Sequence, residues 1–412
     1  MAAAKTKLPL LSEKFNVGMR NGLRARLVEM DDEIEIFLLA LAAKVHAFFL
    51  GKPGIAKSLL VETGIQMIDD LEPDDYFHTL MTKSTTREDL FGPLMLSLLK
   101  QDRYKYQPKG FMPVAKIVNL EEAWKGSAAV LNSLLWFANE RKWRNDGEVL
   151  TVDLHSMFIS SNEMPEGDEL MAIYDRFLLR KSVDGIVEPG NLIAMFKLAD
   201  APVDKIVTWA EVEQAHKEVE AVGVPEDVLE ALVEVKEKLK EKSILPSDRR
   251  LKQGLQVVRA KAWLRGQTQA DIQDLRSLRH VLWNDPEEFT EVDKLVTGLS
   301  NPTDLEIMAI MKDVAGLSTA LDKEIADPGD ADKVKQHCTQ LFDKVEMAME
   351  ELSKIDTRLK DSQRRSEQLG PAKAQVMTFM NRLLTKGFKM SPEEVAASKL
   401  TEFADVEEDD DE

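Results

Sequence analysis

The chain has 412 residues, a formal net charge of −19 and one cysteine, so it is long enough for two or three domains but excludes an internal disulfide framework and a multi-cysteine metal site. Its acidic balance disfavours nucleic acid and anionic membranes as main partners, because phosphate binding relies on basic surfaces. No apolar run reaches the ~18–20 residues of a membrane span, and the first nine residues are not followed by the apolar core of a signal peptide, which predicts a cytoplasmic protein without membrane contact.

Alternating strands and helices in the first half of the chain predict a parallel sheet with helices on both faces. A helix with apolar spacing of three and four begins near Asp31. The apolar run 45–50 follows as a buried strand, and a glycine-rich turn leads from it into a helix over 57–68. The other segments that we expect in this domain are strands over 76–81, 115–120, 155–161 and 179–186 and a helix over 127–139.

Turn and helix signals divide the rest of the chain. The sequence Asn145-Asp146-Gly147 predicts a tight hairpin turn between two short strands. From about residue 204 the strand signals stop, and apolar residues recur at helical spacing. We therefore expect an α/β domain over 1–203, a helical domain over 204–286, a helical extension over 287–391 and an acidic, disordered end over 392–412.

A phosphate-binding loop follows the first predicted strand. Residues 51–58 read GKPGIAKS, which has Walker A spacing with alanine in place of the usual glycine before the lysine. In such a loop backbone N–H groups surround phosphates, the lysine reaches the β- and γ-phosphates, and the hydroxyl of Ser58 ligates Mg²⁺. The residues predicted to bind ATP here are Gly51, Lys52, Pro53, Gly54, Ile55, Ala56, Lys57, Ser58 and Leu59.

Two acids end the strand predicted over 115–120. Glu121 occupies the place of the acid that holds Mg²⁺, usually an aspartate, and Glu122 the place of the acid that polarises the attacking water. Asn119 interrupts the apolar run of this strand. Two glutamates after a strand are, taken alone, more typical of a solvated helix start. The phosphate loop upstream favours the functional interpretation.

These motifs in this order resemble the MoxR family of AAA+ ATPases, and the RavA branch most closely. Besides the two nucleotide motifs, the resemblance rests on Asp89-Leu-Phe-Gly-Pro, Ser161-Asn-Glu-Met-Pro, Tyr174-Asp-Arg and Ser247-Asp-Arg-Arg. It covers about two-thirds of the chain and stops near residue 300. It implies an AAA+ α/β domain, a helical lid, a ring that is usually hexameric, and a chaperone-like role in maturing protein complexes, often with a partner that carries a von Willebrand factor A (vWA) domain.

The resemblance also implies roles for polar residues outside the two nucleotide motifs. Asn162 would orient the attacking water, and Arg176 would act as an arginine finger in the neighbouring subunit, with Arg180 as the reserve candidate. Arg249 would touch the nucleotide from the lid, with Arg250 as its alternate, although either could be solvated. His78 and His155 lie in or beside apolar strands and are interpreted as core residues, and Trp143 on the hairpin is a packing residue or an exposed contact for substrate.

The sequence leaves three functions open. The first is an ATP-hydrolysing, ring-forming remodelling protein of MoxR type that uses ATP and Mg²⁺. The second is a nucleotide-dependent scaffold with little hydrolysis, because Asn119 and Glu121 depart from the usual acidic strand. The third, a nucleic-acid motor, is disfavoured by the net charge.

Overall fold

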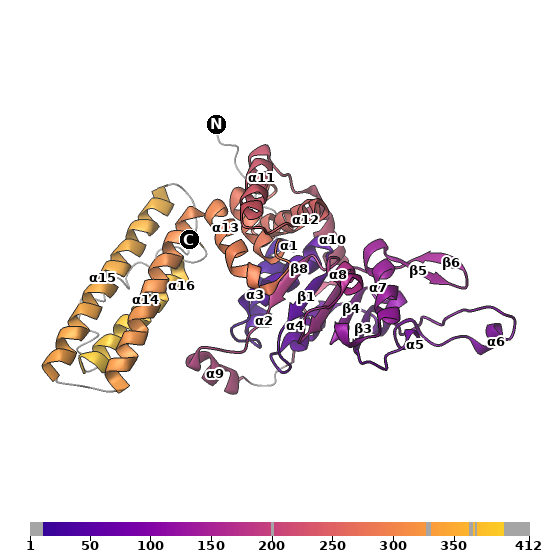
Figure 1. Ribbon diagram of the computed structural model, residues 1–412, viewed down its shortest axis with the longest axis horizontal. Coiled ribbons are helices and arrows are strands. Elements are labelled where there is room, and N and C mark those ends of the chain that lie inside the picture. Colours follow the sequence, from indigo (N-terminus) through magenta and orange to yellow (C-terminus); the bar gives the residue numbers. More distant parts are fainter. Residues whose placement is uncertain (1–10, 199–201, 327–330, 362–365, 367–368, 391–412) are drawn as a thin grey trace. The chain divides into compact units, whose positions relative to one another are not determined.

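The computed structural model describes residues 11–198, 202–326, 331–361, 366 and 369–390, and the chain divides into two compact units, Met1–Val296 and Thr297–Glu412 (Figure 1). The predicted acidic end over 392–412 lies outside the described residues.

A five-stranded parallel sheet forms the centre of the first unit, with the strand order β3-β4-β7-β1-β8. The five strands agree with the predicted segments to within a few residues, and they are β1 (Ala47–Leu50), β3 (Tyr76–Leu80), β4 (Ile117–Glu121), β7 (Ser156–Ser161) and β8 (Leu179–Ser182). A short parallel pair, β2 (Ile68–Asp69) with β9 (Val207–Thr208), is separate from this sheet.

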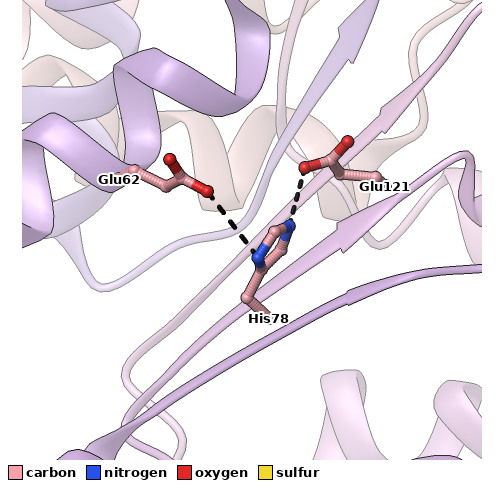
Figure 2. A group of neighbouring side chains, drawn as sticks. All are labelled: Glu62, His78 and Glu121. Carbon is pink, nitrogen blue, oxygen red and sulfur yellow. Dashed lines mark hydrogen bonds and ion pairs between the residues drawn. The ribbon is translucent and has the colours of Figure 1, made fainter.

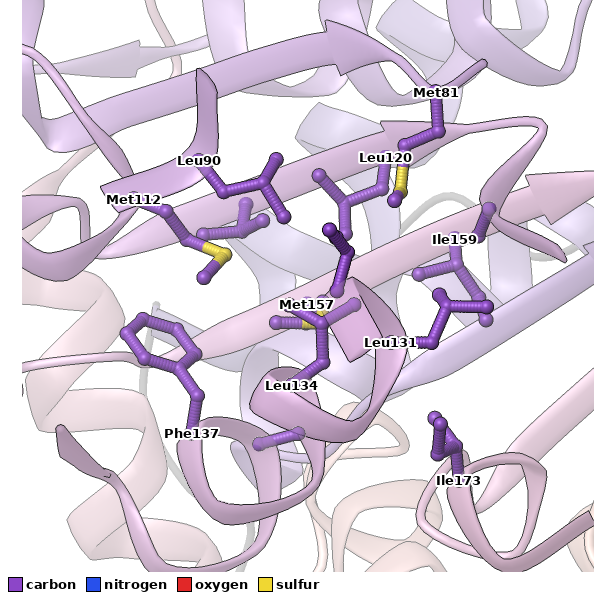
Figure 3. Close-up of a cluster of buried hydrophobic side chains, with 14 of the residues drawn as sticks. Met81, Leu90, Met112, Leu120, Leu131, Leu134, Phe137, Met157, Ile159 and Ile173 are labelled. Atoms are coloured by element: carbon purple, nitrogen blue, oxygen red, sulfur yellow. The ribbon is translucent and has the colours of Figure 1, made fainter. Parts of the chain in front are cut away.

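Helices cover both faces of the sheet. On one face α7 (Ala128–Glu140) and α8 (Asp168–Tyr174) pack their apolar side chains on β4 and β7, as Figure 3 shows for Leu134, Phe137 and Met157. On the other face lie α3 (Asp31–Ala43) and α4 (Lys57–Gln66), where Phe37 stacks on Phe158 at 5.2 Å. Because neighbouring residues of β7 point to opposite faces, Met157 and Phe158 enter different layers. The predicted α/β fold is therefore confirmed.

A hairpin and a longer arm extend from the first unit beyond β3 (Figure 1). The hairpin strands β5 (Lys142–Asn145) and β6 (Glu148–Thr151) are joined by Asp146 and Gly147, both with positive φ, which is the predicted tight turn. The arm lies between α5 (Arg87–Phe91) and η3 (Met112–Val114), and it includes α6 (Leu96–Leu99). Trp143 is buried, and its ring stacks on Phe91 at 6.0 Å. The alternative of an exposed Trp143 is therefore wrong, since the base of the arm covers it.

The helical part of the first unit continues to Val296, about ten residues beyond the predicted end of the lid. Phe289 explains the difference, since its ring contacts Trp283 at 6.3 Å and His280 at the same distance. The longer helices of this part are α10 (Trp209–Ala221), α11 (Glu226–Glu241), α12 (Asp248–Leu264), η5 (Ile272–His280) and α13 (Phe289–Ser300), and α9 (Pro189–Phe196) precedes them. Short helices open the unit: α1 (Leu11–Glu13), η1 (Lys14–Met19) and α2 (Arg20–Arg24).

The second unit is a bundle of three helices among the residues described there, in the part of the chain where the sequence predicts a helical extension. They are α14 (Pro302–Ala326), α15 (Ala331–Asp361) and α16 (Leu369–Arg382), and η7 (Leu383–Gly387) follows the last of them. Cys338 is fully buried in its core. Among the described residues, no helix is both long enough and apolar enough to cross a bilayer.

Candidate functional site

The carboxyl ends of β1, β4 and β7 lie level at one edge of the sheet. Register places Leu50 beside Ser161, and Glu121 lies on the other side of β7 at almost the same height. The backbone N–H of Gly51 donates to the carbonyl oxygen of Ser161 at 2.9 Å, which ties the loop after β1 to the end of β7. The loop, the two glutamates and the exposed Asn162 are thereby brought to one edge.

The loop between β1 and α4 keeps the backbone conformation that a glycine-rich phosphate loop needs. Ala56, which departs from the usual glycine, has φ 63° and ψ 17° immediately before the first residue of α4. A left-handed backbone costs a residue with a β carbon roughly 1–2 kcal/mol, so the surrounding structure holds this alanine in the glycine conformation. The first turn of α4 then presents its backbone N–H groups to the loop, which is a favourable place for a phosphate.

The ammonium group of Lys57 lies inside this loop. Its Nζ donates to the carbonyl oxygens of Gly51 at 2.5 Å and Lys52 at 2.7 Å. Burial lowers the pKa of Lys57, while the carboxylates of Glu122 and Glu121 act in the opposite direction. The loop therefore encloses a cation next to two acids, as binding of a phosphate and its counter-ion would require.

A cavity of about 470 Å³ opens beside the loop, on the side of Gly54 and Leu59. Such a volume lies within the ~300–1,000 Å³ of small-molecule sites. The sequence motifs do not predict the residues that line the two other walls of this cavity. These residues come together only in the folded chain, and no spacing in the sequence marks them. Those walls are residues 26–30 and the segment that contains Asp184, Gly185, Ile186, Leu192, Met195 and Leu198.

Glu121 is not isolated at the end of β4. Its Oε1 lies 2.6 Å from Nε2 of His78 on β3, and Nδ1 of the same ring lies 3.7 Å from Oε1 of Glu62 on α4 (Figure 2). The side chain of His78 is one-third exposed. The interpretation of His78 as a core residue is therefore wrong, whereas His155 is buried with its Nε2 2.8 Å from the carbonyl oxygen of Leu41.

Asn119, which interrupts the apolar strand β4, has a partner on the neighbouring strand. Its side-chain amide donates to the hydroxyl oxygen of Tyr76 at 3.3 Å. Burial raises the pKa of this tyrosine to about 12, so the hydroxyl keeps its proton at neutral pH. The asparagine thus satisfies a polar contact between β3 and β4 and does not disturb the strand.

Glu122 follows Glu121 in a left-handed backbone conformation with φ 51°, which ends the strand. Its Oε2 is buried and accepts no hydrogen bond, and Nζ of Lys125 lies 3.1 Å away as an ion-pair partner. A buried carboxylate oxygen without a hydrogen bond is costly. It is available to a water molecule that would enter the site.

Two of the four predicted arginines, Arg176 and Arg249, lie at the opposite, amino edge of the sheet. Arg176 and Arg249 line a recess of about 70 Å³ together with Lys44 and Arg141, and none of its ten lining residues is a carboxylate. Burial lowers the pKa of Arg176 and the positive charge of Arg249 lowers it further, while Asp175, whose Oδ2 lies 3.4 Å from Nη1 of Arg176, acts in the opposite direction. Arg249 also donates to the side-chain oxygen of Asn139. This recess concentrates positive charge and can bind an anion.

Arg180 and Arg250 are buried connectors between the sheet and the helical part. Arg180 donates to the carbonyl oxygens of Tyr174, Phe177 and Trp283 and is 0% exposed. Arg250 is 1% exposed and donates to the carbonyl oxygen of Phe177 at 2.8 Å. An arginine finger must extend into the neighbouring subunit, and a residue that contacts the nucleotide must reach its phosphates. The burial of both guanidinium groups contradicts these two roles, and it contradicts a solvated Arg250.

Replacing Arg180 with methionine should therefore reduce stability. Breaking a buried charged interaction costs on the order of 3–5 kcal/mol, and three carbonyl groups would lose their donor. All six tryptophans lie in the first unit, so denaturant unfolding followed by tryptophan fluorescence measures this unit. Arg176→Ala serves as the control and should change the free energy of unfolding by less than about 1 kcal/mol. Unchanged stability of Arg180→Met with loss of ATP turnover would restore Arg180 as a catalytic candidate.

Comparison with known proteins agrees with this arrangement of motifs. The MoxR domain of MoxR–vWA–β-propeller ternary systems matches residues 14–220, and an AAA lid domain matches residues 227–296. The chain belongs to the MoxR family of AAA+ ATPases. This MoxR protein is 37% and 38% identical over 285 residues to two uncharacterized proteins of Methanocaldococcus jannaschii, which is 69% of the chain and 74% and 75% of these relatives.

Two more distant similarities extend the comparison. A structural protein of the Acidianus two-tailed virus is 26% identical over 224 residues, which is 51% of this MoxR protein and 36% of the viral one. The crystal structure of a provisionally assigned ATPase from Cytophaga hutchinsonii matches 70% of the chain and 96% of its own, with a TM-score of 0.54 and 17% identity. This structural match supports the fold. The RavA branch stays a prediction.

Proposed function

We propose that this MoxR protein is an ATPase that assembles into a closed ring, with each ATP between two subunits. The observation that carries the proposal is the distribution of charge over the sheet. The phosphate loop and the acids lie at its carboxyl edge, and the cationic recess with Arg176 and Arg249 lies at its amino edge. Residues 45–50 separate the two edges, which at about 3.3 Å per residue is roughly 17 Å. The two halves of the site can therefore meet only between two copies of the chain.

The residues at the carboxyl edge fit a nucleoside triphosphate with Mg²⁺. Lys57 and the first turn of α4 would hold the phosphates, the cavity beside Gly54 would take the base and ribose, and Ser58 and Glu121 would hold the ion. Bound Mg²⁺ would neutralise charge on the phosphates. Glu122 would accept the proton of the attacking water through its Oε2, which accepts no hydrogen bond, and Asn162 would orient that water.

From the neighbouring subunit, Arg176 would neutralise charge that develops on the phosphates. Arg249 would assist it from the start of α12, so the lid residue acts between chains and not on the loop of its own chain. The four basic side chains that line this recess, those of Lys44, Arg141, Arg176 and Arg249, support the assignment, since they leave an excess of positive charge beside the ion pair of Arg176 with Asp175. A ring of six subunits is the arrangement that the family resemblance implies.

The proposed work of the ring is to remodel or mature a protein complex, as the RavA-like motifs imply. The matching MoxR domain is described in systems with a vWA protein and a β-propeller protein. We infer a vWA-domain partner for this chain. Co-purification with a vWA-domain protein of the same organism tests the inference, and failure of the two proteins to associate in the presence of ATP would contradict it.

A nucleotide-dependent scaffold with little hydrolysis is the second candidate. The observation that favours it is the 2.6 Å contact between Glu121 and His78, which holds the predicted Mg²⁺ ligand toward β3. Phosphate release by the wild-type chain distinguishes the two functions. Sustained release with saturating ATP and Mg²⁺ supports the ATPase, and its absence with intact ATP binding supports the scaffold.

Glu122→Gln should bind ATP but hydrolyse it about 10²–10⁴-fold more slowly, which is the contribution of a general base. Glutamine keeps the shape of the side chain but cannot accept the proton. ATP affinity and phosphate release are measured on the same preparation, with Glu140→Gln as a control because Glu140 is exposed at the end of α7. Turnover at the wild-type rate in Glu122→Gln would place the base elsewhere.

A further inference from the structure

Three side chains from three different elements converge beside the phosphate loop (Figure 2). Glu62 lies on α4, His78 on β3 and Glu121 at the end of β4. One ligand atom from each of them lies within 4.8 Å of the other two. We propose that these three residues form a binding site for a divalent transition-metal ion of the Zn²⁺ class, separate from the Mg²⁺ that accompanies ATP.

The backbone places the three side chains on a common side. β3 and β4 are paired with Leu80 opposite Glu121, so His78 is the diagonal neighbour of Glu121 on the same face of the sheet. Glu62 comes one helical turn after Ser58 and therefore lies on the same face of α4 as that serine. Since two strands and a helix hold the cluster, its geometry does not depend on a loop.

The distances suit a small ion after a modest side-chain adjustment. Ligands of tetrahedral Zn²⁺ lie about 2.0–2.2 Å from the ion and hence about 3.3–3.6 Å from one another. The present separations are 2.6 Å between His78 and Glu121 and 3.7 Å between His78 and Glu62. Rotation of the glutamate side chains can equalise them. The side chains are 26–40% exposed, so an ion and a completing water molecule can enter from solvent.

The donor set selects against Mg²⁺. Mg²⁺ prefers six oxygen ligands in octahedral geometry, whereas an imidazole with carboxylates suits Zn²⁺ and related ions. Glu121 belongs to both sites, because it is also the proposed Mg²⁺ ligand. A transition metal in the cluster would hold its carboxylate toward His78 and withdraw it from Mg²⁺. The expected consequence, which rests on the proposed function, is inhibition of ATP turnover.

Calorimetric titration of the nucleotide-free full chain with Zn²⁺ tests the site without any reference to turnover. The wild type should bind one more equivalent of Zn²⁺ than His78→Gln or Glu62→Gln. Each variant should bind this Zn²⁺ at least about 100-fold more weakly. Loss of a residue that only hydrogen-bonds a metal ligand already costs 10–100-fold in metal affinity. Ser58→Ala should bind Zn²⁺ as the wild type does. Equal binding by the wild type and His78→Gln would overturn the site.

A matched control comes from α10, where His216 lies 3.6 Å from a single carboxylate, that of Glu220. His216→Gln should keep the extra equivalent, because this pair lacks the third ligand. Co²⁺ provides a second readout, since its visible absorption should appear in the wild type and disappear in both cluster variants. Loss of binding in His216→Gln but not in His78→Gln would also overturn the site.

Phosphate release in the presence of added Zn²⁺ tests the effect on Glu121. Turnover of the wild type at saturating Mg²⁺ and ATP should fall as the cluster fills, while Glu62→Gln should keep its turnover over the same Zn²⁺ range. Equal inhibition of both would overturn the competition for Glu121. If the chain has no turnover at all, the proposed ATPase fails, and the titration still decides whether the metal site exists.

Discussion

Lys57→Ala should abolish ATP turnover and weaken ATP binding by at least about 100-fold. Lys57 is the cation enclosed by the loop, and its Nζ already lies within hydrogen-bond distance of two carbonyl oxygens there. Hydrogen bonds to charged groups contribute about 1.5–3 kcal/mol each, and 1.4 kcal/mol corresponds to a factor of ten in affinity. Loss of contacts to two phosphates therefore removes at least two orders of magnitude.

Equilibrium binding of a fluorescent ATP analogue and steady-state phosphate release measure the two effects of Lys57→Ala. Lys238→Ala is the control, since it removes a partly exposed lysine from α11. Circular dichroism establishes that the variant is folded. This control is needed because Lys57 also donates hydrogen bonds to backbone carbonyl oxygens of the loop. ATP affinity and turnover equal to those of the control would refute the phosphate-loop assignment.

Arg176→Ala should reduce turnover by about 10³-fold or more, within the range of arginine fingers, and leave ATP affinity nearly unchanged. The reason is its position at the amino edge of the sheet, away from the phosphate loop of its own chain. An arginine that meets the nucleotide of a neighbouring subunit stabilises the transition state and contributes little to ground-state binding. Arg176→Lys should recover only part of the rate, because lysine lacks the planar fork of donors.

Mixing two inactive variants tests whether Arg176 acts between subunits. In a mixed ring a Lys57→Ala subunit supplies an intact Arg176 to the intact loop of an Arg176→Ala neighbour. Phosphate release should therefore reappear in the mixture, although neither variant has activity alone. Rings shown to contain both variants yet devoid of turnover would contradict a role between chains, and equal loss of ATP binding would contradict a catalytic role.

Local sequence determined the nucleotide motifs and the elements that carry them. The run 45–50, the following glycines and Lys57 are neighbours in the chain, so spacing alone predicts a strand, a phosphate loop and a helix start. The same holds for β4, with Glu121 at its end and Glu122 directly after it, and for the turn at Asp146 and Gly147. In each case the interactions that form the feature span only a few residues, and local propensity is therefore sufficient.

Contacts between distant parts of the chain decided the remaining features. Spacing could not reveal that His78 meets Glu62 and Glu121, because that depends on the pairing of β3 with β4 and on the packing of α4. The same limit applies to Arg180 and Arg250, which look like exposed functional arginines in sequence but are buried between the sheet and the helices. The role of a charged side chain depends on its surroundings, and for Arg180 these come from residues as far as 103 positions away in the chain. Only the tertiary structure therefore separated Arg176 and Arg249, which line a cationic recess, from the two arginines that hold the fold together.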